Sequence, residues 1–119
     1  MLFLHEFGPI EAEAFLTLAS ELIEEDGVVT AEEDALLAEY IEALDVRGFT
    51  YDAAATAAAR DTMAQLNEVS KRKVYMELYS FAVCDDFATA CRVVADARKK
   101  GLWARATSFG SARAMIVST

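Results

Sequence analysis

Apolar side chains recur every three or four positions along the first part of the chain. Between residues 10 and 25 they fall at i, i+3, i+4, i+7 and i+8, and polar residues occupy most of the other positions. This period predicts an amphipathic α-helix. The apolar positions are Phe15, Leu18, Ala19, Leu22 and Ile23.

Two local signals predict where this helix ends and where the next one begins. Gly27 suits the left-handed backbone that commonly follows a helix. Thr30, with Glu33 three residues later, matches a capping box, in which each side chain accepts a hydrogen bond from the backbone amide of the other residue. A second helix is therefore predicted to run to about residue 45. Its predicted buried stripe consists of Leu37, Tyr40, Ile41 and Leu44.

Three more helices are predicted further along the chain. Residues 52–67 are rich in alanine, the best helix former. Residues 70–84 leave little polar face, so this helix is expected to be the most buried. Residues 90–100 form a helix with Thr89 as its N-cap and three basic residues at its end. The tail after Leu102 has weak periodicity and is either a short packed helix or an irregular strap.

The absence of strand patterns and of glycine-rich linkers predicts an all-α fold. We expect one compact domain over residues 1–119, a bundle of five to seven helices, with the structure of residues 103–119 left open. Residues 85–90 repeat the aspartate, threonine and alanine of residues 26–31 in register, 59 positions later. Both segments follow an apolar helix, which favours two repeated helix-turn-helix halves.

Composition narrows the function classes further. No apolar run approaches the roughly 18 residues of a membrane span, and the first residues lack the basic start of a signal peptide, so a cytoplasmic protein is expected.

Cys84 and Cys91 would lie about 10 Å apart on a single helix, too far for a disulfide. Together with His5, the only histidine, they match no zinc motif.

Charge is distributed very unevenly. The first 46 residues contain thirteen acidic residues and no lysine or arginine, whereas residues 47–119 contain seven acidic and eleven basic residues. This asymmetry can draw the two halves together, attract a basic partner or cations, or simply produce a solvated helix face. It disfavours nucleic acid as a partner.

The turn between the first two helices is the candidate site. Glu24 and Asp26 lie near the negative end of the first helix macrodipole, where carboxylates are unfavourable. If Gly27 is aligned with the glycine of a calcium-binding loop, Glu24, Asp26 and Glu33 take its third, fifth and twelfth positions. Leu22 takes the first position and cannot ligate, so a complete EF-hand is excluded. The turn is either a weak site for Ca²⁺ or Mg²⁺ or a group of solvated and capping acids.

This pattern resembles the tellurite-resistance TerB-like domain family. The residues that carry the resemblance are Asp26 and Gly27 after an apolar helix, then Glu33, with leucines and isoleucine following over residues 36–44. The segment from residue 70 to Asp85 is similar to the lead-in to the family's second half, and the resemblance covers residues 8–102. Arg92 stands where the second glutamate of the motif belongs, and the tail departs from the family's closing helix.

The resemblance implies a compact all-α cytoplasmic domain with two pseudo-symmetric halves, associated with metal binding and stress response. By motif position it assigns metal-binding roles to Asp26 and Glu33, with Asp85 as their counterpart in the second half. Whether tellurite concerns this chain stays open.

Catalysis is the least expected class, because the chain lacks a phosphate-binding glycine loop and a nucleophile elbow. Two function classes remain. One is a module that binds divalent cations at Glu24, Asp26, Glu33 and Asp85. The other is an acidic module for protein–protein interaction without a metal, whose partner is a different protein or a second copy of the chain.

Overall fold

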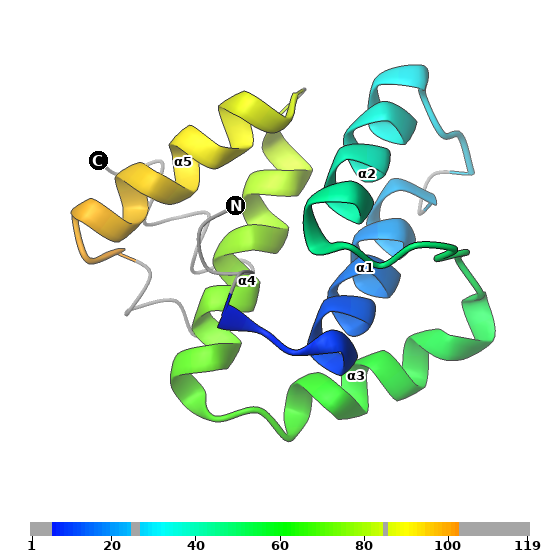
Figure 1. Ribbon diagram of the computed structural model, residues 1–119, viewed down its shortest axis with the longest axis horizontal. Helices are drawn as coiled ribbons and strands as arrows, with labels where there is room; N and C mark the ends of the chain where they lie inside the picture. The colour runs from blue at the N-terminus through cyan, green and yellow to red at the C-terminus, as the bar shows by residue number, and fades with distance from the viewer. Residues whose placement is uncertain (1–5, 25–26, 85, 103–119) are drawn as a thin grey trace.

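The computed structural model describes residues 6–24, 27–84 and 86–102, and within these residues the chain is helical, without any strand (Figure 1). The helices are α1 (Pro9–Glu24), α2 (Ala31–Leu44), α3 (Thr56–Ala64), α4 (Glu68–Val83) and α5 (Phe87–Lys99), and a 3₁₀ turn, η2 (Ala53–Ala55), precedes α3. The all-α prediction is confirmed. None of these helices combines the length and the apolar character that a bilayer crossing requires. The tail over residues 103–119 lies outside the described residues.

Helix α1 lies at the centre of the bundle. It packs between α4 and α2, and α3 runs across one end of these helices and contacts α1 extensively (Figure 1). Nine of the sixteen residues of α1 are buried, against seven of the sixteen of α4. The prediction that the helix over residues 70–84 is the most buried is therefore wrong. The composition of residues 70–84 shows how apolar that helix is, whereas the burial of a helix depends on how many other helices surround it.

Two polar residues of α1 are buried together with its apolar stripe. The Thr17 hydroxyl donates to the Glu13 carbonyl oxygen over 2.9 Å, and the Ser20 hydroxyl donates to the Leu16 carbonyl oxygen over 2.8 Å. Because each hydroxyl is satisfied within its own helix, burying it costs little. This allows α1 to contact its neighbours on more sides than its apolar pattern predicts.

Tyr40 attaches α2 to the rest of the core. Helix α2 buries only Leu36 and Tyr40. The Tyr40 ring is 0% exposed, and its centroid lies 5.5, 5.4 and 5.1 Å from the ring centroids of Phe15, Phe81 and Phe87. These distances are typical of favourable aromatic pairs. One side chain therefore joins α2 to α1, to α4 and to α5.

Helix α5 begins at Phe87, earlier than predicted, and its N-cap is Asp86 rather than Thr89. One Asp86 carboxylate oxygen accepts a hydrogen bond from the Thr89 backbone amide over 2.8 Å, and the other accepts from the Thr89 hydroxyl over 3.0 Å. Aspartate caps a helix better than threonine, and here its two oxygens take both donors. The same bonds lower the pKa of the Asp86 carboxyl, the backbone bond most strongly.

The repeat seen in the sequence matches the first helix of each half but not the turn. Helix α4 starts and ends 59 residues after α1, and both have sixteen residues. The second helices, α2 and α5, begin only 56 residues apart, at positions 31 and 87. The second turn is therefore three residues shorter than the first.

The two cysteines do not share a helix. Cys84 is the C-cap of α4, and Cys91 belongs to α5. The spacing of about 10 Å expected on one helix therefore does not apply to this pair. Both are free thiols, Cys84 buried and Cys91 partly buried.

Candidate functional site

The turn after α1 has the capping geometry that the sequence predicts. Helix α1 ends at Glu24, whose carbonyl oxygen accepts a hydrogen bond from the Gly27 amide over 3.0 Å. Gly27 has a φ of 77°, which is in the left-handed region. The Glu33 amide donates to the Thr30 hydroxyl oxygen, and the Thr30 amide donates to the Glu33 carboxylate, both over 3.1 Å. The capping box is confirmed.

Of the four predicted metal ligands, the structure describes two. Glu33 is partly buried, and one of its carboxylate oxygens serves the cap. Glu24 is exposed, and no lysine or arginine nitrogen of the described residues lies within 4.0 Å of its carboxylate. Asp26 and Asp85 lie outside the described residues. In the described part of the chain, histidine, cysteine, aspartate and glutamate side chains form no group of three that could hold a metal ion. The cation site stays a prediction.

Replacing Thr30 with alanine should lower the free energy of unfolding by about 1 kcal/mol, because the Glu33 amide at the start of α2 loses its acceptor. Urea unfolding followed by circular dichroism measures the change. The matched control is Thr50→Ala, at an exposed loop position, which should change the free energy of unfolding far less. Equal effects of the two substitutions would show that the cap contributes nothing measurable.

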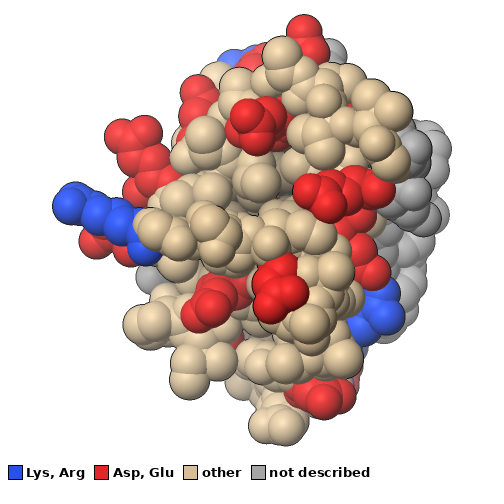
Figure 2. Space-filling view, turned by 90° about the vertical axis from the view of Figure 1, so that its right-hand side faces the viewer, with Lys and Arg blue, Asp and Glu red and all other residues tan. Residues whose placement is uncertain are grey.

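Helix α2 carries a second acidic group, which we call the α2 acidic face. It consists of the exposed carboxylates of Glu32, Asp34, Glu39 and Glu42. In the described part of the chain, no lysine or arginine nitrogen lies within 4.0 Å of any α2 carboxylate. Figure 2 looks onto the side of the molecule where α2 and the start of α3 lie: acidic side chains are spread across this side, and basic ones lie at its margins.

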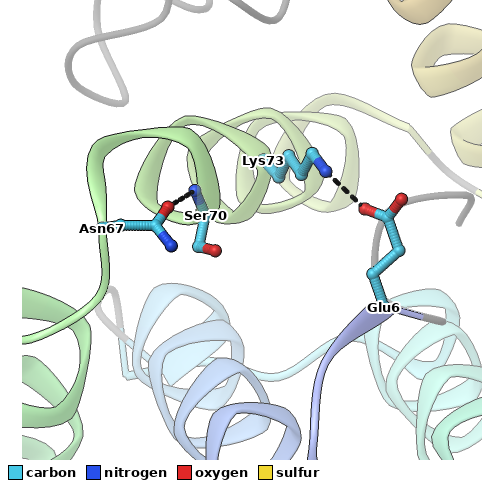
Figure 3. Close-up of polar contacts among 4 residues, drawn as sticks. All are labelled: Glu6, Asn67, Ser70 and Lys73. Atoms are coloured by element: carbon cyan, nitrogen blue, oxygen red, sulfur yellow. Dashed lines mark hydrogen bonds and ion pairs between the residues drawn. The ribbon is translucent and has the colours of Figure 1, made fainter.

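Other acids of the first half do pair with bases of the second half. The Lys73 ammonium, on α4, lies 2.6 Å from the Glu6 carboxylate just before α1 (Figure 3). Arg60, on α3, lies 2.6 Å from the Glu21 carboxylate on α1. Figure 3 also shows the Asn67 side chain capping α4 by accepting from the Ser70 amide. The charge asymmetry thus joins the two halves at these points but leaves α2 uncompensated.

The acids in the first turn of α2, Glu32 and Asp34 among them, suit the positive end of its macrodipole, but those near its end are unfavourable for the helix. The last turn of α2 holds no basic residue, so Glu42 faces the negative end of the macrodipole. Glu39 and Glu42 are three residues apart, a spacing at which like charges destabilise a helix by about 0.2–0.5 kcal/mol. The other exposed residues of α2 are alanines, whose small side chains leave the acidic groups accessible to another chain. They stand at positions 31, 35, 38 and 43.

Sequence reasoning also missed a buried acid. Glu77 on α4 is 0% exposed and lies in the core near Tyr40. Burial raises the pKa of the Tyr40 hydroxyl well above its usual value, and the Glu77 carboxylate raises it further. The one charged position in the apolar stretch over residues 74–83 was the available signal, but only the position of Tyr40 beside α4 shows what that residue faces.

Comparison of the chain with protein-family models, with curated proteins and with solved structures finds no match.

Proposed function

We propose that this chain is a non-catalytic interaction domain that binds a basic polypeptide through the α2 acidic face. The observation that carries the proposal is the contrast between paired and unpaired acids. Glu6 and Glu21 have cations within 2.6 Å, whereas the exposed carboxylates of α2 have no described cation within 4.0 Å.

A basic segment that binds along α2 would relieve two unfavourable electrostatic interactions at once. It would screen the like charges on the helix surface, and it would place positive charge at the negative end of the macrodipole. A second copy of the chain is a poorer occupant, because a symmetric contact between two α2 helices would bring like charges together. The homodimer alternative therefore requires a different surface.

The test is a titration with a lysine- and arginine-rich peptide, followed by fluorescence anisotropy. The variant Asp34→Asn with Glu39→Gln and Glu42→Gln should weaken binding about tenfold, since each exposed pair contributes about 0.5 kcal/mol. The matched control Asp61→Asn with Glu68→Gln and Asp96→Asn removes the same net charge from exposed positions elsewhere. It should weaken binding less than threefold. Equal weakening by both variants would mean that only net charge matters, which would overturn the proposal.

A divalent-cation site at the turn after α1 is the second candidate function. It is supported by the exposed Glu24 carboxylate at the negative end of α1, without a described cation nearby, and by the resemblance to the TerB-like domain. Its ligands would be Glu24, Asp26 and Glu33, with Asp85 as the second-half counterpart.

Calorimetric titration with Ca²⁺ and with Mg²⁺ tests this second function. Binding is expected at millimolar metal or below, and Asp26→Asn with Glu33→Gln should abolish it. Glutamine retains an oxygen that can accept from the Thr30 amide, so Glu33→Gln alone separates the charge from the cap. No heat of binding at millimolar metal, or the same heat with the double variant, would remove the cation site.

A further inference from the structure

A cleft of about 530 Å³ opens between the start of α1 and the end of α2. Phe7, Pro9, Leu44 and Val46 supply its apolar lining. Phe7, Leu44 and Val46 are each only partly buried, and all three line the cleft. The cleft is large enough for one aliphatic or aromatic side chain from another molecule.

Acidic groups border the same cleft. Glu13 and Asp45 both line it, and Asp45 directly follows α2. Arg47 also lines it, paired with Asp45 at 3.2 Å, but the two side chains are 94% and 77% exposed, so this pair is weak and easily exchanged for another cation. The cleft lining therefore mixes apolar side chains with charged groups, and its charged residues, Glu13, Asp45 and Arg47, sum to a net charge of −1.

The cleft lies at the end of α2, the helix that carries the α2 acidic face. Leu44 lines the cleft, and Asp34 lies ten residues before it, which corresponds to about 15 Å of helix. A partner helix of about ten to fifteen residues spans that distance. Its basic residues at helical spacing would follow the acids of α2 while one apolar residue reaches the cleft.

We propose that this cleft receives one large apolar side chain, leucine or phenylalanine, from a basic amphipathic helix of the partner. The inference rests on the proposed function, since charge complementarity with the α2 acidic face is what selects a basic helix as the occupant. It adds a specificity element: the acids attract basic segments in general, and the cleft selects those that carry an apolar anchor.

Two peptides and two variants test the cleft. The peptides are basic amphipathic helices that differ only in the anchor, leucine or alanine. Wild-type protein should bind the leucine peptide about tenfold more tightly. Ala43, at the exposed edge of the cleft, becomes leucine in the test variant, which fills part of the space. The matched control, Ala95→Leu, adds the same side chain at an exposed position of α5, outside both the cleft and the α2 acidic face.

Ala43→Leu should reduce the preference for the leucine peptide to less than threefold, and Ala95→Leu should leave it unchanged. Thermal unfolding by circular dichroism checks that both variants fold.

Equal affinity of wild-type protein for the two peptides, or an unchanged preference in Ala43→Leu, overturns the anchor cleft. If the anchor cleft is overturned in this way but peptide binding still depends on Asp34, Glu39 and Glu42, the proposed function stands without the cleft. A change in sedimentation with Ala43→Leu, in place of a change in peptide preference, identifies a second copy as the occupant and also overturns the inference.

Discussion

Replacing Tyr40 with alanine is expected to lower the free energy of unfolding by about 3–5 kcal/mol, the range typical of a large aromatic side chain removed from a core. The ring is 0% exposed and forms three aromatic pairs, with Phe15, Phe81 and Phe87. Because α2 buries only one other residue, Leu36, this helix would then be held mainly by Leu36 and by partly buried side chains such as Leu37 and Ile41. Typical domains are stable by only about 5–15 kcal/mol, so the variant should be close to its unfolding threshold at 37 °C.

Urea unfolding monitored by circular dichroism gives the size of this effect. Tyr51→Ala is the matched control, because Tyr51 is only partly buried and lies in the loop after α2. It should cost far less than Tyr40→Ala. Amide hydrogen exchange adds a local readout: α2 should lose more protection than α4 in the Tyr40→Ala protein, since α4 keeps its contacts with α1 and α5. A loss below about 1 kcal/mol would show that Leu36 and the partly buried stripe attach α2 on their own.

The parts of the fold that sequence reasoning predicts well are those encoded locally. Gly27 with its positive φ, and the capping box of Thr30 and Glu33, depend only on residues a few positions apart. The helix boundaries near them follow to within one or two residues. At α5 the sequence predicts Thr89 as the cap of a helix that begins at about residue 90. Asp86 was a competing local signal and is the better acceptor.

The parts that it misses depend on tertiary packing. Helix α1 is central because α2, α3 and α4 pack around it. The sequence of residues 9–24 alone does not show how many helices will contact it. The candidate site shows the same limit. The acids of α2 are plain in the sequence, but only the structure shows that Lys73 pairs with Glu6 and Arg60 with Glu21, while no lysine or arginine of the described residues pairs with an α2 acid.

The pairs Lys73–Glu6 and Arg60–Glu21 also explain the choice of binding surface. The proposed surface is the α2 acidic face and not the whole acidic half of the chain. A uniformly solvated acidic half would leave Glu6 and Glu21 without ion-pair partners as well. Instead Arg60 of α3 and Lys73 of α4 pair with them, and the exposed α2 acids have no such pair among the described residues. Salt dependence of partner binding should therefore report mainly on α2, because the internal pairs are already formed.

Stability in alkaline solution should depend strongly on the Tyr40 hydroxyl. Its pKa in the folded protein is raised, first by burial, then by the Glu77 carboxylate, with smaller contributions from Cys91 and Cys84, and only the Ser80 side chain opposes the shift. In the unfolded chain a tyrosine has a pKa of about 10. The folded state therefore keeps a proton that the unfolded state releases above that pH. The stabilisation is complete below about pH 10 and is lost as the pH rises above it.

The expected loss is about 1.4 kcal/mol in the free energy of unfolding for each pH unit above 10, which makes about 2 kcal/mol at pH 11.5. Urea unfolding at pH 8, 10, 11 and 11.5 measures the slope. Tyr40→Phe keeps the ring and its three aromatic contacts but removes the titrating group, so its slope should be shallower by that amount. All other ionisable groups are the same in the two proteins, so the comparison isolates the Tyr40 hydroxyl. Parallel slopes for the two proteins would mean that the folded and unfolded states release this proton at the same pH, and that the hydroxyl of Tyr40 reaches water in the folded domain.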